Sequence, residues 1–276
     1  MKIEFTKMHG LGNDFMVINQ VTQNVELTPD MIRRWADRHT GVGFDQLLLV
    51  SPPTSPDVDF RYRIFNADGT EVEQCGNGAR CFARFVYDKN LTNKNVIPVE
   101  TNTGRIELQL VSGGLVTVNM GAPIFEPERI PLIAQQQQPL YQFTAEGETV
   151  QMACVSMGNP HGVLQVEDVD TAPVATMGPR LEAHPNFPNK ANIGFCQVVD
   201  RDNLRLRVFE RGVGETRACG TGACAAAVAN IAAGRVNNKV NVTLPGGTLQ
   251  IEWQGEGHPV LMTGPATTVY EGTITL

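Results

Sequence analysis

Short runs in which apolar and polar positions alternate or cluster dominate the chain, and this pattern is typical of β-strands. Four such runs are rich in β-branched or apolar residues, and turn residues bound most of them. They occupy residues 61–65, 116–120, 204–209 and 240–244. The chain is therefore predicted to be mostly β-sheet.

Three helices are predicted among these runs. One begins near Thr28, because a capping residue and an early proline precede apolar residues at helical spacing. The other two cover about residues 78–87 and 222–233, and Gly234 ends the second. Strands, one central helix and further strands follow one another twice, so we predict an α+β fold and not a parallel doubly wound sheet.

One motif occurs twice, together with its surroundings. CGNGA at Cys75–Ala79 recurs as CGTGA at Cys219–Ala223, 144 positions later. When residues 61–80 are shifted by that distance, eight of 20 positions are identical, whereas average composition gives about one by chance. The repeat predicts two pseudo-symmetric halves, each mostly β with a central helix.

The boundary between the halves is expected near 121–131, where prolines concentrate. We expect the first half, which holds Cys75, to comprise residues 1–120 plus 264–276. The second half, which holds Cys219, should comprise residues 121–263.

Composition narrows the possible partners. The net charge of −7 argues against nucleic acid or an anionic membrane surface as a partner.

The amino terminus alternates charged and apolar residues, unlike a secretory signal. The uncharged stretch Ala218–Gly234 is too short and too weakly apolar to span a membrane, so it is predicted to be a buried helix. We expect a cytoplasmic protein.

Six cysteines in a chain without a signal peptide indicate reduced thiols. Metal binding is the first alternative, but Cys75 and Cys81 are six residues apart and Cys219 and Cys224 five, unlike the usual zinc spacing. The glycine pairs of residues 10–13 and 41–43 lack the remaining residues of a dinucleotide or phosphate motif. We therefore predict neither a metal nor another cofactor.

The sequence around the two repeated thiols favours a catalytic role for them. A thiolate at a helix start is stabilised by backbone N–H groups and the helix dipole, which lower the pKa of the thiol. The glycines of each motif would let N–H groups approach an anion such as a carboxylate. Two thiols, one on each face of a carbon, suit inversion: one removes the proton and the other delivers a new one.

Most cysteines without a disulfide are simply small buried residues, and this interpretation competes with the chemical one. Recurrence in one glycine context at two predicted helix starts favours chemistry for Cys75 and Cys219. Cys81, Cys154, Cys196 and Cys224 lack that context, so core packing is expected for them.

Long segments resemble one known family in order along essentially the whole chain. NADGTEVEQCGNGAR at Asn66–Arg80 and ERGVGETRACGTGAC at Glu210–Cys224 are similar to diaminopimelate epimerases. KMHGLGNDF, GFDQ, SMGNPH and ANIGF match the same family. The resemblance implies a pyridoxal-independent enzyme that converts LL-2,6-diaminopimelate to the meso form, in lysine and peptidoglycan precursor synthesis.

The resemblance also implies roles for particular residues. Cys75 and Cys219 would be the acid/base pair, and Tyr270 would lie at the interface of a homodimer. Substrate contacts would come from Asn13, Gln46, Asn66, Gly76, Asn77, Asn159, Asn192, Glu210, Arg211, Gly220 and Thr221. Taken singly, each asparagine is more typical of a turn, and Glu210 with Arg211 of a solvated ion pair.

The repeat adds a difference between the halves. His161 falls opposite Phe15 and Glu210 opposite Asn66, so both ionisable members lie in the second half. Our hypothesis is that His161 and Glu210 tune the protonation of the two thiols, a role that the resemblance also suggests. A loop histidine shaped by Pro160 is the competing interpretation.

Other functions remain open at this stage. A racemase for proline or hydroxyproline would share the two thiols, although Asn66, Asn192 and Arg211 suit a longer substrate with a distal zwitterion. A non-catalytic amino acid binding protein and a redox switch are the alternatives from other classes.

Overall fold

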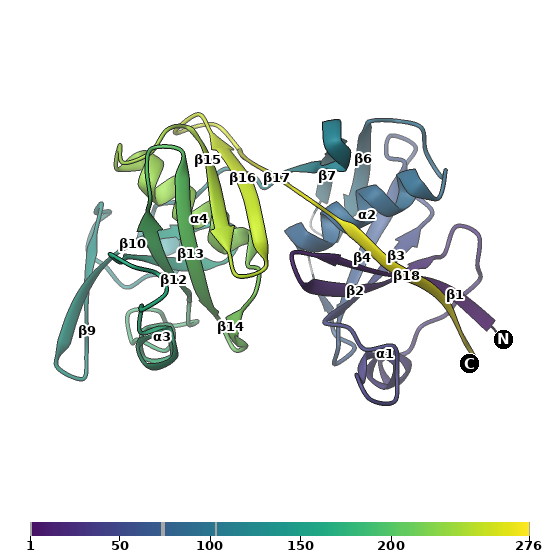
Figure 1. Ribbon diagram of the computed structural model, residues 1–276, viewed down its shortest axis with the longest axis horizontal. Coiled ribbons are helices and arrows are strands. Elements are labelled where there is room, and N and C mark those ends of the chain that lie inside the picture. The colour runs from purple at the N-terminus through teal and green to yellow at the C-terminus, as the bar shows by residue number, and fades with distance from the viewer. Residues whose placement is uncertain (1, 73–74, 103, 276) are drawn as a thin grey trace. The chain divides into compact units, whose positions relative to one another are not determined.

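The computed structural model describes residues 2–72, 75–102 and 104–275, and the chain forms two compact units (Figure 1). The first unit comprises Met1–Asn119 with Thr263–Leu276, and the second comprises Met120–Met262. Within the described ranges, none of the helices combines the length and the apolar character that crossing a membrane requires.

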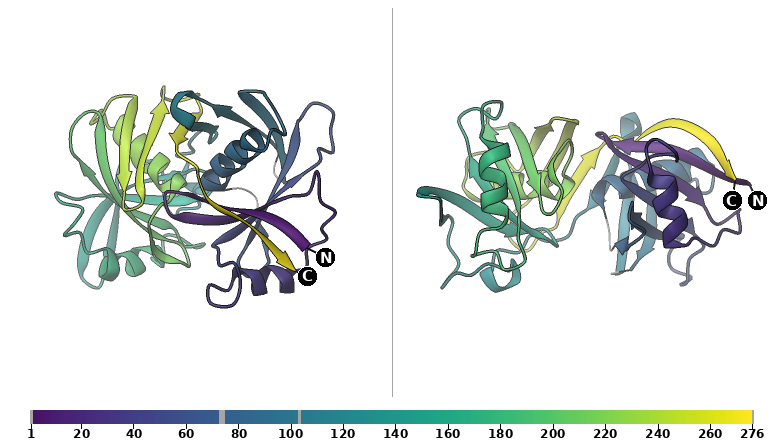
Figure 2. Two further views of the ribbon diagram at one scale, coloured as in Figure 1. Left: turned by 45° about the vertical axis from the view of Figure 1, so that its right-hand side comes forward. Right: turned by 90° about the horizontal axis from the view of Figure 1, so that it is seen from below.

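The described residues of the first unit form nine strands, two α-helices and one short 3-10 helix. They are β1 (Lys2–Gly10), β2 (Asn13–Asn19), α1 (Pro29–Ala36), β3 (Gln46–Ser51), β4 (Phe60–Asn66), β5 (Glu71–Val72), α2 (Gly76–Asp88), β6 (Val96–Thr101), β7 (Gly104–Leu110), η1 (Ser112–Gly114), β8 (Val116–Asn119) and β18 (Thr267–Thr275). Strand β18 pairs antiparallel with β1, which places both ends of the chain side by side (Figures 1 and 2).

The elements of the second unit follow a matching order. They are η2 (Pro127–Arg129), β9 (Tyr141–Ala145), β10 (Glu148–Ser156), β11 (Pro160–Gln165), α3 (Val174–Glu182), β12 (Asn192–Val198), β13 (Asn203–Glu210), β14 (Gly214–Thr216), α4 (Gly220–Ala232), β15 (Lys239–Leu244), β16 (Gly247–Trp253) and β17 (Val260–Gly264). The last residues of β17 belong to the first unit.

Strand pairing repeats between the units. In the first, β2 and β3 are parallel, β4 is antiparallel to β3, and β6 is parallel to β4. In the second, β11, β12, β13 and β15 pair in the same way. The register repeats too, since Phe65 faces Glu71 and Phe209 faces Glu215. The predicted α+β fold with two pseudo-symmetric halves is confirmed.

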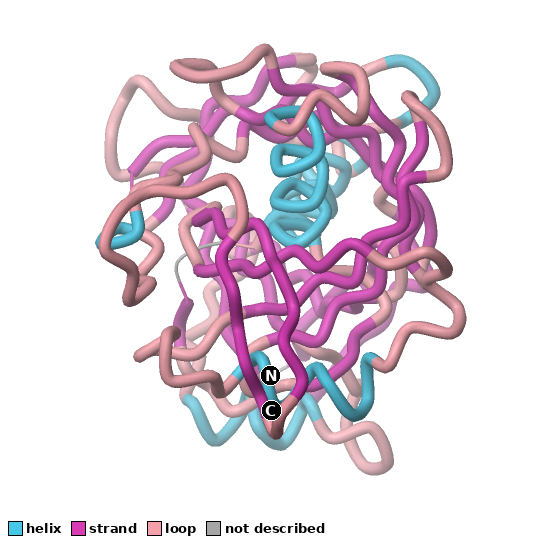
Figure 3. Tube along the Cα trace, turned by 90° about the vertical axis from the view of Figure 1, so that its left-hand side faces the viewer, coloured by secondary structure: helices cyan, strands magenta, loops and turns pink. Residues whose placement is uncertain are grey.

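In the second unit, which faces the viewer in Figure 3, one helix lies within the curve of the strands, and helix contacts show an equivalent arrangement in the first unit. Helix α2 contacts strands from β1 to β8, and α4 contacts strands from β10 to β16. Helix α4 fits this enclosed position because its alanines are small and fully buried, as at Ala225–Ala227. The prediction of a buried helix over Ala218–Gly234 is confirmed.

A second helix in each unit covers the opposite face of the strands. Helix α1 packs Ile32 and Trp35 against Leu47 and Leu49 of β3, whereas Leu48 between them lies next to α2. Side chains alternate between the two faces of a strand, so α1 and α2 lie on opposite sides of it. Helix α3 builds the equivalent cluster in the second unit.

The helix starts agree closely with the sequence. Thr28 caps α1, its side chain accepting a hydrogen bond from the Met31 N–H at 3.3 Å. The two central helices begin at Gly76 and Gly220, each two residues before the predicted start. In both, the thiol residue directly before the helix occupies the N-cap position.

Candidate active site

In the first unit, the predicted site residues lie where strands and a helix begin or end. Asn13 and Gln46 begin β2 and β3, and Asn66 ends β4. Because β3 pairs with both neighbours here, with Gln46 opposite Asn66 and next to the start of β2, the three lie at one edge of the sheet. Gln46 Nε2 donates to Asn66 Oδ1 at 3.0 Å.

Cys75 lies beside two asparagines of this unit. Its half-buried thiol is 3.7 Å from Asn13 Oδ1, within reach of a sulfur hydrogen bond. Asn77 Nδ2 donates to the same oxygen at 3.2 Å. The structure thus brings together Asn13, Cys75, Gly76 and Asn77. Glu73 and Gln74, part of the segment that carried the resemblance, lie outside the described residues.

The second unit surrounds Cys219 with a different set of groups. The sulfur lies 3.6 Å from Thr221 Oγ1, which accepts from Asn159 Nδ2 at 3.3 Å. The Oδ1 of Asn159 bonds with His161 Nε2 at 2.9 Å. A chain of hydrogen bonds therefore runs from the buried His161 to the Cys219 thiol, with Gly220 and Thr221 forming the first turn of α4.

Asn192 begins β12 at the position equivalent to Gln46, and it is buried. Its Oδ1 accepts from the Arg211 backbone N–H at 3.0 Å, and its Nδ2 donates to the Pro160 carbonyl at 3.1 Å. Asn192 therefore fixes the backbone on either side of the predicted site. The exposed Arg211 side chain donates to the Asn189 carbonyl at 3.3 Å.

The expectation that a helix start lowers the thiol pKa is wrong for Cys219. Burial raises its pKa well above the usual value, and the charge of Glu210 raises it further. Bonds from Thr221 and from the Gly222 N–H act in the expected direction, but burial outweighs them. Burial and the Glu210 charge thus favour the thiol form of Cys219 over its thiolate.

His161 is neutral across the ordinary pH range. Burial of its ring and the nearby positive charge of Arg211 lower its pKa to about 3. The hydrogen-bonded link from His161 through Asn159 and Thr221 to Cys219 therefore carries no positive charge. Because Asn159 Oδ1 only accepts, the proton lies on Nε2 of His161.

The second glycine of each motif, Gly78 or Gly222, has a packing role that sequence reasoning missed. A Cβ on Gly78 would lie 2.5 Å from the Tyr62 hydroxyl, and one on Gly222 would lie 3.0 Å from Val208. Both neighbours lie on strands against which the central helix packs. These glycines allow the helix to approach the sheet closely, whatever binds at its start.

The remaining cysteines fill the core as predicted. Cys81, Cys154, Cys196 and Cys224 are buried. Burial raises the pKa of Cys81 to about 12 despite the charge of Arg80, and it raises that of Cys196 to about 12 as well. Such thiols stay protonated and unreactive at neutral pH.

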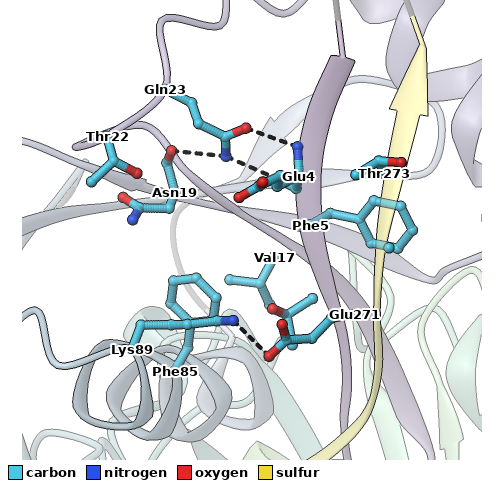
Figure 4. A pocket seen from close by; sticks show the side chains of 12 residues that line it. Glu4, Phe5, Val17, Asn19, Thr22, Gln23, Phe85, Lys89, Glu271 and Thr273 are labelled. Atoms are coloured by element: carbon cyan, nitrogen blue, oxygen red, sulfur yellow. Dashed lines mark hydrogen bonds and ion pairs between the residues drawn. The ribbon is translucent and has the colours of Figure 1, made fainter.

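A separate pocket of about 430 Å³ lies in the first unit (Figure 4). Glu4, Gln23, Lys89 and Glu271 line it, and Lys89 pairs with Glu271 at 2.6 Å. None of its lining residues is a predicted site residue. Tyr270 lies on β18 beside Glu271, is 44% exposed, and packs its ring edge against Phe5.

Sequence reasoning also missed residues that hold the site residues in place. Asp45 accepts from Asn13 Nδ2 at 2.9 Å, and Arg80 donates to Asn77 Oδ1 at 2.9 Å. Glu182 accepts from the Gly212 N–H at 2.7 Å, directly after Arg211. Asp45 and Arg80 stand inside the motifs given above, but the contact of Asp45 joins segments 32 residues apart in sequence.

Solved structures with low sequence identity share this fold. A phenazine biosynthesis protein of the PhzF family from Bacillus anthracis has a TM-score of 0.69 at 18% identity, with 100% of both chains covered. A hydroxyproline epimerase from Agrobacterium vitis has a TM-score of 0.68 at 15% identity, with 99% of this chain and 92% of that chain covered. The chain therefore belongs to the fold class of these two proteins.

Sequence comparison is more specific. The family model described as Diaminopimelate epimerase matches residues 5–126 and 153–269. A diaminopimelate epimerase of Ectopseudomonas mendocina strain ymp is 62% identical over 276 residues, with 100% of both chains covered. The chain belongs to the diaminopimelate epimerase family, and it is an isomerase.

Proposed function

We propose that this enzyme converts LL-2,6-diaminopimelate to meso-diaminopimelate by a two-cysteine acid/base mechanism without a cofactor. The reaction would serve lysine and peptidoglycan precursor synthesis in the cytoplasm. One observation carries the proposal most directly: two thiols occupy the N-cap positions of equivalent helices. Cys75 lies beside Asn13 at the start of β2, and Cys219 is linked through Thr221 to Asn159, directly before the equivalent strand β11.

In this mechanism the thiolate of one cysteine removes the α-proton and becomes a thiol. The electron pair left on carbon delocalises into the adjacent carboxylate, where backbone N–H groups of a helix start stabilise the added charge. The thiol of the other cysteine then delivers its proton to the opposite face and becomes a thiolate. The two cysteines exchange roles when the reaction reverses, and solvent exchange restores the starting protonation.

The unequal surroundings of the thiols support separate roles. Cys219 is buried beside Glu210 and keeps its proton, which suits the proton donor in one direction of the reaction. Glu210 and His161 are proposed to modulate the thiols, Glu210 through its charge and His161 through Asn159 and Thr221.

The remaining predicted residues suit a substrate with an ammonium and a carboxylate at each end. Arg211 can pair with a distal carboxylate, and Glu210 can accept from an ammonium. Amide side chains can serve either group, and they come from Asn13, Gln46, Asn66, Asn77, Asn159 and Asn192. A proline racemase would need a short apolar pocket instead, so we expect no turnover of proline or hydroxyproline.

Deuterium exchange tests the mechanism. In deuterated water the native enzyme should place deuterium at one α-carbon of diaminopimelate, measured by mass spectrometry. Cys75→Ala and Cys219→Ala should each lower turnover roughly 10²- to 10⁴-fold, the usual contribution of a general acid or base. Cys154→Ala, which alters a buried thiol outside both sites, is the matched control and should remain active. Incorporation that survives both single substitutions would exclude the two-cysteine mechanism.

We also propose a homodimer that contacts through β18. Val269 and Tyr270 are 54% and 44% exposed on this strand, which is more apolar side chain than a strand facing only water usually presents.

A further inference from the structure

Three side-chain contacts form a continuous chain beside Cys75. Arg80 donates from a guanidinium N–H to Asn77 Oδ1 at 2.9 Å. Asn77 Nδ2 donates to Asn13 Oδ1 at 3.2 Å. Asn13 Nδ2 in turn donates to Asp45 Oδ2 at 2.9 Å.

The two ends of the chain set the direction of every bond in it. A guanidinium can only donate hydrogen bonds, and a carboxylate can only accept them. Asn77 must therefore turn its oxygen to Arg80 and its amide N–H to Asn13. Asn13 must likewise turn its N–H to Asp45, which leaves its oxygen facing the Cys75 sulfur at 3.7 Å.

An oxygen in this position distinguishes the two forms of the thiol. It can accept a hydrogen bond from the S–H of Cys75, but it can donate nothing to a thiolate. If the Asn13 amide turned over, its N–H would favour the thiolate. That rotation would break the bond to Asp45 and place the Asn13 N–H against the Asn77 N–H. The hydrogen bonds with Asp45 and Asn77 therefore oppose the rotation.

Asp45 is anchored on its other side. Arg38 donates to Asp45 Oδ1 at 2.8 Å, and the Asp14 backbone N–H donates to Oδ2 at 3.1 Å. Burial alone would raise the pKa of Asp14, but bonds from Arg38 and Lys7 outweigh it and hold that pKa well below the usual range. The carboxylate of Asp45, which ends this series of hydrogen bonds, is therefore held in place by neighbouring charged residues.

Among the residues that the structure describes, the second half lacks an equivalent series of hydrogen bonds. By strand register and motif alignment, Ala191 stands at the position of Asp45, Thr221 at that of Asn77 and Cys224 at that of Arg80. Asn159, the equivalent of Asn13, has the opposite orientation, with Oδ1 toward His161 and Nδ2 toward Thr221. The two asparagines therefore present opposite ends of their amides toward the two thiol sites.

We propose that Asp45 and Arg80 are positioning residues that hold Cys75 as a thiol in the substrate-free enzyme, by fixing the Asn13 oxygen toward its sulfur. The inference rests on the proposed role of Cys75 in proton transfer, but the protonation of Cys75 is measurable without turnover. Substrate that displaces Asn13 from the sulfur would release this preference, and Cys75 would then lose its proton to solvent before it acts as the base.

The test measures alkylation of Cys75 by iodoacetamide against pH, with the Cys75 peptide quantified by mass spectrometry. Asp45→Ala, which gives the first half the residue of the second, removes the acceptor of the Asn13 N–H, so that only the Asn77 N–H at 3.2 Å still opposes turnover of the Asn13 amide. The pH at half-maximal alkylation rate should fall by roughly one unit, because the N–H group then stabilises the thiolate. Asp45→Asn retains an oxygen that can accept from Asn13, so it should restore most of the native midpoint. The Cys219 peptide in the same samples should not change.

Arg38→Met is the matched control, since it removes the ion pair of Asp45 but leaves the carboxylate. The two side chains are 54% and 45% exposed, and exposed pairs contribute little, so the midpoint should stay within roughly 0.2 unit of native. If Asp45→Ala does not fold, Asp45→Ser makes the same comparison. A folded Asp45 variant without an acceptor and with the native midpoint overturns the proposal.

Activity separates this proposal from the proposed function. Asp45→Ala should shift the acid limb of the kcat/KM profile to lower pH together with the alkylation midpoint. An unchanged midpoint, alongside loss of deuterium incorporation in Cys75→Ala, would reject the positioning role while leaving the two-cysteine mechanism intact. Full incorporation in Cys75→Ala would instead reject the mechanism.

Discussion

At Cys219 two influences on the thiol oppose each other. The helix start offers the Gly222 N–H, which favours the thiolate, while burial and the Glu210 charge favour the thiol and dominate. The sequence identified the helix start correctly, but how deeply the sulfur is buried follows from the packing of distant segments. For the same reason, the orientation of Asn13 was not predictable, because Asp45 is 32 residues away in sequence.

Removing the charge of Glu210 should make Cys219 ionise at lower pH. In Glu210→Gln the alkylation midpoint of Cys219 should fall by roughly one unit, although burial keeps it above that of an exposed thiol. Glu215→Gln is the control, because Glu215 pairs with Arg207 at 2.6 Å and is not among the groups that shift Cys219. Equal midpoints in both variants would contradict a direct effect of Glu210.

His161 makes stability depend on pH. Its pKa is about 3 in the folded protein against 6.5 for a free side chain, so below pH 6.5 the unfolded chain takes up a proton that the folded chain excludes. Stability is therefore full above pH 6.5 and declines as pH falls toward 3. Between pH 7 and pH 5 the loss should be about 2 kcal/mol, measured by urea unfolding. His161→Gln should lack this contribution, and a pH dependence identical to native would contradict it.

At the scale of elements, the local pattern of apolar, capping and turn residues was enough to predict most of the strands and helices that we expected. The four strand runs lie within observed strands, apart from Met120 directly after β8, and Thr28 caps α1 as expected. Helix α3 escaped prediction because Gly178 and Pro179 interrupt it, and both residues normally argue against a helix interior. Gly178 is required there, since a Cβ would lie 2.7 Å from the Phe209 ring.

The close approach of α2 to the sheet is testable at Gly78. In Gly78→Ala the added methyl would overlap the Tyr62 hydroxyl, which should destabilise the protein by roughly 1–3 kcal/mol. The same change in a Tyr62→Phe background should cost less, because the hydroxyl is gone. The measurement is thermal or urea unfolding of the four proteins. Equal costs in both backgrounds would show that another contact, such as Leu48 at 3.2 Å, limits the site.

At the scale of the whole molecule, the repeat predicted two halves of one design, and the strand pairing confirms that design. Even an ion pair recurs: Arg63 pairs with Glu71 and Arg207 with Glu215. The proposed differences between the two thiol sites come from single positions at which the halves carry different residues, such as Phe15 and His161. The repeat identifies these positions, but it does not show what each side chain contacts.

The proposed homodimer gives a prediction at this scale. Tyr270→Ala should shift the protein toward a monomer at micromolar concentration, because an aromatic side chain would be lost from the interface. Light scattering coupled to size-exclusion chromatography measures the mass. Val213→Ala is the control, since Val213 is 75% exposed in the second unit. A monomeric native protein, or a Tyr270→Ala dimer as stable as native, would contradict the proposal.

The pairing of β1 with β18 has a consequence for synthesis of the chain. A ribosome completes the continuous second unit before it produces β18, so the second unit can fold while β1 still lacks this partner. Helix α2 also contacts a residue that is translated after the second unit, because Arg80 Nε donates to the Pro265 carbonyl, just before β18, at 3.1 Å. The first unit, which holds Cys75, can therefore be completed only after the second unit has been translated, although Cys75 itself is translated long before Cys219.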